Sequence, residues 1–266
     1  RCSRNCPNRS LSPKQKQKPI PSPISSPTPD PGRIPDRAKT PPMSEPRPAG
    51  AGSGMPLGIF GGSFDPVHLG HLRLAEEALE TLQLERVRWI PAGQPWHRDA
   101  LRTDAAHRLA MVRLATASNP AFEVDAREAE AGAPGYTADT LQALRAELGL
   151  ERPLVLILGA DAFSQLHTWQ RWKSLFELAH IGLATRAGQA VDPAALDGAL
   201  ATELSARLQR DPAALCAAPA GAVIPFDMTA LAISATDLRA RLARGASCRY
   251  LAPTGVLDYI RHHRLY

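Results

Sequence analysis

Short apolar runs that alternate with amphipathic stretches constrain this chain more than any other feature. The clearest run is 154–158, which reads Leu-Val-Leu-Ile-Leu and is followed by Gly159. Such a run is typical of a strand that is covered on both faces. Helical spacing of apolar residues follows most of the runs after residue 55. The pattern predicts right-handed βαβ units and an α/β fold with a doubly wound parallel sheet, in which ligands bind beyond the carboxyl ends of the strands.

The same periodicity predicts where the elements lie. Strands are expected at 57–60, 86–92, 122–124, 153–158, 181–184 and 222–225. Helices are expected directly after the glycine turn at 61–63, at 104–117, at 138–148, through 169–178, near 193–208, at 236–243 and at 254–262. The last two helices form a small helical C-terminal end to the fold.

The first 54 residues differ in composition from the rest. They hold 13 of the 25 prolines, and 10 Lys and Arg against 3 Asp and Glu give them a net charge of +7. A segment of this kind buries too little apolar surface to offset the entropy of ordering. We therefore predict a disordered basic tail over 1–54 and one folded domain over 55–266. Because the chain starts with Arg and Met residues precede the folded pattern, an over-long gene model is favoured over a functional arm.

The remaining composition limits the partners and the compartment. Residues 55–266 contain 21 basic and 23 acidic side chains, a net charge of −2, so the folded part gives no general reason to bind nucleic acid. No apolar stretch is long enough to span a membrane, and the tail lacks the apolar region of a secretory signal. The four cysteines show no zinc spacing, which is typical of a reducing cytosol. A cytoplasmic location is expected.

The strongest chemical signal follows the first expected strand, where 61–71 reads Gly-Gly-Ser-Phe-Asp-Pro-Val-His-Leu-Gly-His. Glycines allow the backbone to approach a ligand, and the start of the next helix offers free N–H groups and the positive end of its dipole. His68 and His71 share a face of the first helical turn, and Gly70 leaves room for an anion. The combination predicts a nucleotide-phosphate site, although surface histidines or a metal pair would explain the two histidines taken alone.

Together with later landmarks, this segment resembles the HxGH nucleotidyltransferases, and among them the nicotinate-nucleotide adenylyltransferase family. The resemblance covers essentially all of residues 57–266. The later landmarks, in order, are Pro95-Trp96-His97-Arg98, Tyr136-Thr137 with Thr140-Leu141, Gly159-Ala160-Asp161, Trp169, Ile233-Ser234-Ala235-Thr236 with Arg239, and Tyr250-Leu251-Ala252-Pro253 leading to Tyr259-Ile260 and Leu265-Tyr266. Class I aminoacyl-tRNA synthetases share a related HxGH element, but they need a lysine-bearing KMSKS-like loop, and 233–239 contains no lysine.

The resemblance implies a Rossmann-like nucleotidyltransferase that uses ATP and nicotinate mononucleotide. A phosphate oxygen of the mononucleotide would attack the α-phosphorus of ATP, giving nicotinate adenine dinucleotide and pyrophosphate. A phosphate monoester has a second pKa of about 6 and is already a nucleophile near neutral pH. Catalysis then depends on alignment and on charge stabilisation. Mg²⁺ carried with ATP is the expected cofactor, because no Asp/Glu cluster in the sequence forms a dedicated metal cage.

The resemblance also assigns residues to each substrate. His68 and His71 are expected as catalytic hydrogen-bond donors to the ATP phosphates, with His71 at the α-phosphate. The other ATP-binding residues are expected to be Gly61, Gly62, Ser63, Phe64, Gly159, Asp161, Ser234, Thr236 and Arg239. Those for nicotinate mononucleotide are His97, Arg98, Tyr136, Thr137, Thr140, Trp169 and Arg186, with Trp169 stacking on the pyridine ring. Helix capping is an alternative role for Asp161, Ser234 and Thr236, and a core position is one for Trp169.

Two departures from the family pattern concern the acceptor. Gly135 stands where the family often has Ser, and Trp96 and Arg98 stand where it often has Pro and Lys; Arg keeps the charge but changes the geometry. One alternative is an adenylyltransferase of the same fold that acts on nicotinamide mononucleotide or on another phosphorylated acceptor such as phosphopantetheine. A second, non-enzymatic alternative is a nucleotide-binding or nucleic-acid-binding module that uses the basic tail. The sequence does not indicate an oligomeric state.

Overall fold

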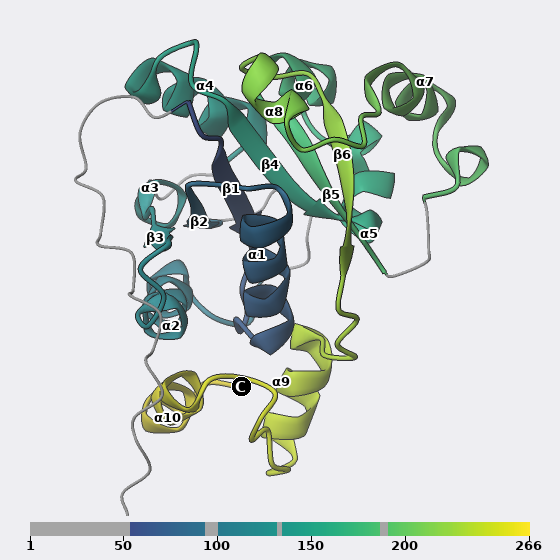
Figure 1. Ribbon diagram of the computed structural model, residues 1–266. Coiled ribbons are helices and arrows are strands. Elements are labelled where there is room, and N and C mark those ends of the chain that lie inside the picture. Colours follow the sequence, from purple (N-terminus) through teal and green to yellow (C-terminus); the bar gives the residue numbers. More distant parts are fainter. Residues whose placement is uncertain (1–53, 94–100, 132–134, 187–190) are drawn as a thin grey trace, which may run out of the picture. The chain divides into compact units, whose positions relative to one another are not determined.

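Parallel strands form the centre of the computed structural model, which describes residues 54–93, 101–131, 135–186 and 191–266. In this part of the chain one sheet holds six strands in the order β3-β2-β1-β4-β5-β6, all parallel (Figure 1). Their bounds are β1 Leu57–Gly62, β2 Arg86–Pro91, β3 Phe122–Val124, β4 Leu154–Gly159, β5 His180–Arg186 and β6 Val223–Met228. The chain order reverses between β1 and β4, so the carboxyl ends of these two strands border the crevice where a doubly wound sheet binds ligands. The predicted fold class is confirmed.

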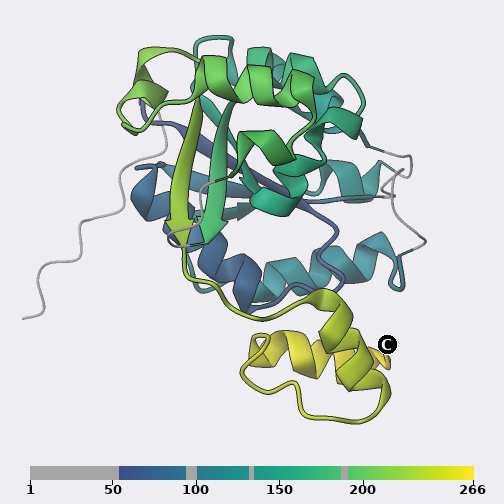
Figure 2. The same cartoon turned by 90° about the vertical axis from the view of Figure 1, so that its right-hand side faces the viewer.

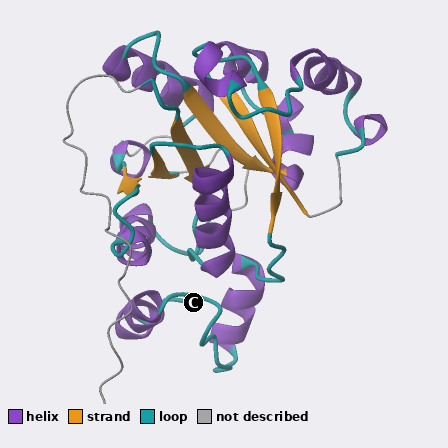
Figure 3. Cartoon of the chain, in the orientation of Figure 1, coloured by secondary structure: helices purple, strands orange, loops and turns teal. Residues whose placement is uncertain are grey.

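Helices cover both faces of the sheet (Figure 3). The α-helices are α1 Leu69–Thr81, α2 Ala105–Thr116, α3 Arg127–Glu130, α4 Thr137–Leu148, α5 Ala160–Ser164, α6 Leu175–Leu178, α7 Gly198–Arg207, α8 Ala214–Ala217, α9 Ala235–Ala243 and α10 Thr254–His263. The 3₁₀ turns among the described residues are η1 Leu166–Thr168, η2 Trp172–Ser174 and η3 Pro193–Ala195. None of the helices in the described ranges is long and apolar enough to cross a bilayer.

The apolar run in β4 shows why helices pack on both faces of the sheet. Val155 and Ile157 pack into a core with α1, α2, α9 and α10. Leu154, Leu156 and Leu158 point to the opposite face and pack with α4, α5, α6 and α7. Successive side chains of a strand alternate between its faces, so a run that is apolar at every position requires an apolar partner on each side. At the C-terminal end, α9 and α10 lie beyond the carboxyl end of β6 (Figure 2).

The continuous helix predicted through 169–178 is wrong. The chain makes α5, η1, η2 and α6 in succession, and Arg171 adopts a left-handed backbone with φ of 54°. The helix expected near 193–208 also begins later, at Gly198, because Asp197 accepts hydrogen bonds from the first backbone N–H groups of α7. Short α3 and α8 were not predicted, since single helical turns have no periodicity to detect. The predicted tail at 1–54 lies, except for Gly54, outside the described residues and stays a prediction.

Candidate active site

The two histidines of the 61–71 segment stack on each other where α1 begins. His68 is the N-cap of α1, and its ring lies 3.6 Å from that of His71, centroid to centroid, with 23° between the planes. The backbone N–H of His68 donates to Nδ1 of His71 at 3.2 Å. In neutral His71 the proton is therefore on Nε2, which makes that nitrogen the hydrogen-bond donor.

The His68 ring is almost completely buried. Its exposed fraction is 6%, and burial lowers the pKa of His68 from 6.5 to about 4. Its Nδ1 has no hydrogen-bond partner among the described residues. A buried polar atom without a partner is costly in a folded protein. At neutral pH the ring is uncharged and can still donate one hydrogen bond.

A hydrophobic floor supports His71. The Phe64 ring is 1% exposed and meets the His71 ring edge-on at 5.1 Å; it also packs against Phe60 and Trp89. Phe64 holds a left-handed φ of 47°, and a Cβ on Gly62 would lie 2.9 Å from its ring. Glycine is thus required at 62 for close packing. The Phe64 ring lies in the core, so the role predicted for Phe64 in ATP binding could involve only its backbone.

A buried arginine fixes the loop that precedes the histidines. Arg108 of α2 is 1% exposed, and its guanidinium donates to the carbonyl oxygens of Ser63 at 2.8 Å, Gly93 at 2.5 Å and Thr103 at 3.1 Å. It therefore joins the ends of β1 and β2. Burial lowers the pKa of Arg108, and the nearby Asp65 charge opposes this effect. Sequence reasoning missed this residue; its one signal is a charged side chain amid apolar residues of α2.

The second predicted phosphate-binding segment lies against the first. A Cβ on Gly70 would be 3.1 Å from the His68 ring and 3.8 Å from the carbonyl oxygen of Ile233, which directly precedes the N-cap of α9. Nη1 of Arg239 donates to the carbonyl oxygen of Asp65 at 2.6 Å. The first turns of α1 and α9 therefore meet, and two positive helix ends face one region.

The polar side chains of α9 have local partners. Ser234 is the N-cap of α9, and its Oγ accepts from the backbone N–H of Asp237 at 3.0 Å, so the alternative capping role of Ser234 is confirmed. Nη2 of Arg239 donates to Oγ1 of Thr236 at 3.2 Å. Thr236 thus steadies Arg239 and does not cap the helix.

The carboxyl end of β4 is open. Gly159 is the N-cap of α5, and a Cβ built on it would meet nothing within 4 Å. Asp161 is exposed in the first turn of α5. Because Gly159 occupies the cap position and no side chain caps this helix, the capping role considered for Asp161 is wrong. Since β1 and β4 pair, both residues lie at the same edge of the sheet as the histidines.

The predicted acceptor residues begin α4. Tyr136 is its N-cap, and Thr137 is its first residue. Thr140 is buried, and its Oγ1 donates to Oε1 of Glu128 at 2.5 Å, so this hydroxyl is engaged within the protein. Burial raises the pKa of Glu128. A Cβ on Gly135 would lie 3.2 Å from the Glu128 carboxylate, which explains why a small residue fits here. Glu128 was not predicted from the sequence.

Trp169 lies between η1 and η2 and packs, partly buried, against the core on the α4 side of the sheet. Arg171 forms an ion pair with Asp139 of α4 and also contacts Gln142 at 3.5 Å. These contacts hold the Trp169 turn beside the first turns of α4. Arg186 is exposed at the end of β5. His97 and Arg98 lie outside the described residues, so their predicted roles stay predictions.

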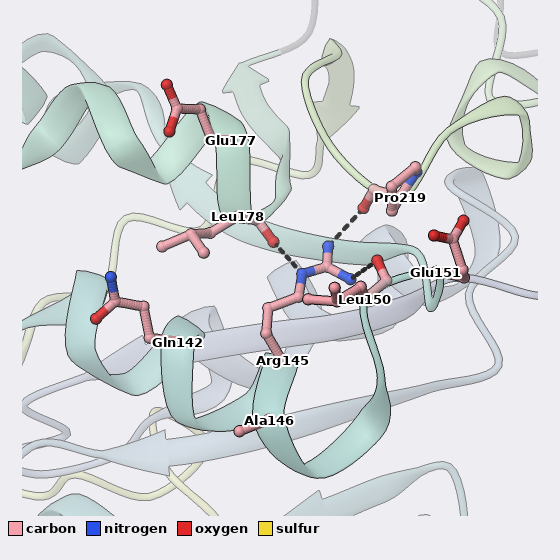
Figure 4. Close-up of a pocket in the computed structure, with 8 residues that line it drawn as sticks. All are labelled: Gln142, Arg145, Ala146, Leu150, Glu151, Glu177, Leu178 and Pro219. Atoms are coloured by element: carbon pink, nitrogen blue, oxygen red, sulfur yellow. Dashed lines mark hydrogen bonds between the residues drawn. The ribbon is translucent and has the colours of Figure 1, made fainter.

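A cavity of about 500 Å³ lies elsewhere, at the amino ends of β4, β5 and β6 (Figure 4). At its centre the Arg145 guanidinium donates to the carbonyl oxygens of Leu178 at 2.8 Å, Leu150 at 3.1 Å and Pro219 at 2.7 Å, and also to that of Arg152. The side chain therefore ties together the chain segments that enter three strands. Since ligands of doubly wound sheets bind at the opposite edge, this cavity is not the candidate site.

The parallel sheet and the helix ends at its switch point define a Rossmann-like nucleotidyltransferase. In agreement, the model of the cytidylyltransferase-like family matches residues 59–241. A probable nicotinate-nucleotide adenylyltransferase of Dechloromonas aromatica (strain RCB) is 54% identical over 211 residues, which are 79% of this chain and 97% of that protein. One of Pseudomonas putida (strain W619) is 46% identical over 210 residues, 79% of this chain and 94% of that protein. The chain belongs to the nicotinate-nucleotide adenylyltransferase family.

A solved structure shows the same fold at much lower identity. The nicotinic acid mononucleotide adenylyltransferase of Plasmodium falciparum, complexed with NaAD, has a TM-score of 0.60 and 16% sequence identity, and the match covers 80% of this chain and 97% of that one. At this identity the likeness concerns the fold.

Proposed function

We propose that the chain transfers the adenylyl group of MgATP to nicotinate mononucleotide, giving nicotinate adenine dinucleotide and pyrophosphate in NAD biosynthesis. The observation that carries this proposal is the meeting of the stacked His68–His71 pair with the first turn of α9 at the carboxyl end of β1. The names of the relatives support it. So do the Plasmodium falciparum structures with NaAD and with APC.

In this reaction a phosphate oxygen of the mononucleotide attacks the α-phosphorus of ATP. The bond from that phosphorus to the oxygen bridging to the β-phosphorus breaks, and pyrophosphate leaves. His71 donates from Nε2 to the α-phosphate, and His68 donates a second hydrogen bond nearby. Ser234, Thr236 and Arg239 hold the β- and γ-phosphates at the start of α9, where backbone N–H groups and the helix dipole favour anions. The protein supplies alignment and charge stabilisation, not a nucleophile.

Mg²⁺ enters with ATP as part of the substrate. Among the described residues, no group of three or more His, Cys, Asp or Glu side chains could hold a metal ion. Phosphate oxygens and water commonly supply most of the ligands of Mg²⁺ in nucleotide sites, and we propose the same here. At the other end of ATP, Asp161 lies beyond β4, where a carboxylate can accept hydrogen bonds from ribose hydroxyls.

The acceptor binds between the start of α4 and the Trp169 turn. Trp169 offers an aromatic face to the pyridine ring, and Tyr136 and Thr137 line the same region. His97 and Arg98 bind the phosphate of the acceptor, with Arg186 as a further cation. Nicotinamide mononucleotide is the alternative acceptor, and the product assay must compare the two. We place the reaction in the cytoplasm and assign it no nucleic-acid or membrane partner.

Deleting residues 1–54 separates this enzyme from a binding module that depends on the basic tail. The truncated chain should release pyrophosphate from ATP and nicotinate mononucleotide at the rate of the full chain, because the proposed site residues all lie after residue 60. The truncated chain carrying His71→Ala is the matched control and should be nearly inactive. Loss of activity on deletion would instead assign the ligand to the tail.

A further inference from the structure

Asp65 is a junction between segments that are far apart in the sequence. It lies between β1 and α1 and is 3% exposed. One carboxylate oxygen, Oδ2, accepts from the backbone N–H of Arg102 at 2.9 Å. The other, Oδ1, accepts from the hydroxyl of Tyr266 at 2.5 Å. Its carbonyl oxygen accepts from Arg239. A buried carboxylate needs such partners, because an unpaired one is strongly destabilising.

Tyr266 is a permanent donor in this junction. Burial raises the pKa of the Tyr266 phenol, and the hydrogen bond to Asp65 raises it further. The hydroxyl therefore stays protonated throughout the pH range in which a protein of this kind works. Because the partner is a carboxylate, the bond is charge-assisted and stronger than one between neutral groups. The Leu265-Tyr266 landmark thus contacts the loop that leads to the histidines.

The contact also reaches a proposed ATP ligand. Arg239 binds the same residue, Asp65, through its main-chain carbonyl oxygen, so a shift of the Asp65 backbone would also move the group that anchors Arg239. Arg102, whose backbone N–H binds the Asp65 carboxylate, lies four residues after Arg98, which is proposed to bind the acceptor phosphate together with His97.

We propose that Tyr266 is a positioning residue for ATP binding: its hydroxyl holds Asp65, and Asp65 in turn holds Arg239 against the loop that carries His68 and His71. The inference rests on the proposed function, since ATP is the ligand. Tyr266 would thus affect ATP binding without direct contact with substrate.

The test is Tyr266→Phe, which removes only the hydroxyl, in the full chain. Calorimetric titration with MgATP should show a Kd about fivefold or more above that of the unchanged chain, which is the size expected when a residue without ligand contact acts on binding through its neighbours. In turnover assays, KM for ATP should rise by a similar factor, with a smaller change in kcat. Tyr259→Phe is the matched control: it removes a phenol hydroxyl of α10 that bonds to His107 at 2.9 Å and not to the loop, and it should change the Kd by less than about twofold.

Asp65→Asn weakens the same contact from the other side, and it provides the answer if Tyr266→Phe does not fold. It should raise the Kd for MgATP by a comparable factor, and the effect of the double variant should be smaller than the sum of the two single effects, because both substitutions act on the same hydrogen bond. An unchanged Kd in folded Tyr266→Phe, even with a lower melting temperature, would overturn the proposal, as would additive effects. The proposed function is tested by a different measurement, the turnover of the unchanged chain. The role of Tyr266 is tested by the ratio of the MgATP Kd values of Tyr266→Phe and the unchanged chain.

Discussion

Acidification should destabilise this protein through His68. The His68 pKa is about 4 in the folded chain against an ordinary 6.5, so the unfolded chain binds more protons between these two values. Stability must then rise with pH across this window and fall as pH is lowered through it. At about 1.4 kcal/mol for each pH unit, the difference corresponds to about 3 kcal/mol lost between pH 7 and pH 4. That is a sizeable share of the stability of a typical domain.

His68→Asn isolates this effect. Asn does not titrate and is a favourable N-cap residue for α1, so the variant should lose about 3 kcal/mol less than the unchanged chain over the same acidification. Urea unfolding at pH 7, 6, 5 and 4 measures the free energy of unfolding at each pH. His180 is also buried with a lowered pKa, but it is present in both chains and cancels. His262→Asn, at an exposed position, should keep the pH dependence of the unchanged chain. Parallel loss of stability in the unchanged chain and His68→Asn would refute the reasoning.

Two further substitutions test a proposed catalytic residue, His71, and the buried Arg108 that fixes the loop before it. His71→Ala should lower turnover about tenfold or more, as expected for loss of a donor to the transferring phosphate, with an unchanged far-ultraviolet circular dichroism spectrum; unchanged turnover would remove His71 from the site. Arg108→Met should lower the free energy of unfolding by about 3 kcal/mol, because three backbone carbonyls lose their donor at about 1 kcal/mol each. Arg113→Met, at an exposed position of the same helix, should change it by less than about 0.5 kcal/mol in urea unfolding.

The sheet was predictable because its strands carry a strong local signal. The run at 154–158 is apolar at every position, and each of the strands β1 to β6 overlaps a predicted segment. The turn at Trp169 was not predictable, since apolar residues over 169–178 suit a helix and nothing local shows that Arg171 adopts a left-handed backbone. There the chain follows tertiary contacts, which include the ion pair of Arg171 with Asp139.

The candidate site also contains residues that could be predicted from the sequence and residues that could not. Glycines and histidines within 61–71 are close in sequence, so their shared location followed from spacing alone. Arg108 and Glu128 act through burial and partners elsewhere in the chain, and a charged residue on a helix ordinarily suggests a solvated face. The contact between Asp65 and Tyr266 joins residues 201 positions apart. No periodicity contains such information, because it arises only when the sheet and the C-terminal helices are folded together.

The acceptor tests the central claim most directly. Pyrophosphate release should be measured at saturating MgATP with nicotinate mononucleotide and with nicotinamide mononucleotide, and the dinucleotide product identified by mass. If the start of α4 and the Trp169 turn select a carboxylate, kcat/KM for nicotinate mononucleotide should exceed that for the amide by about a hundredfold, as expected where a site donates hydrogen bonds to a charged group that the competitor lacks. Equal specificity constants, or no dinucleotide from nicotinate mononucleotide, would contradict the account.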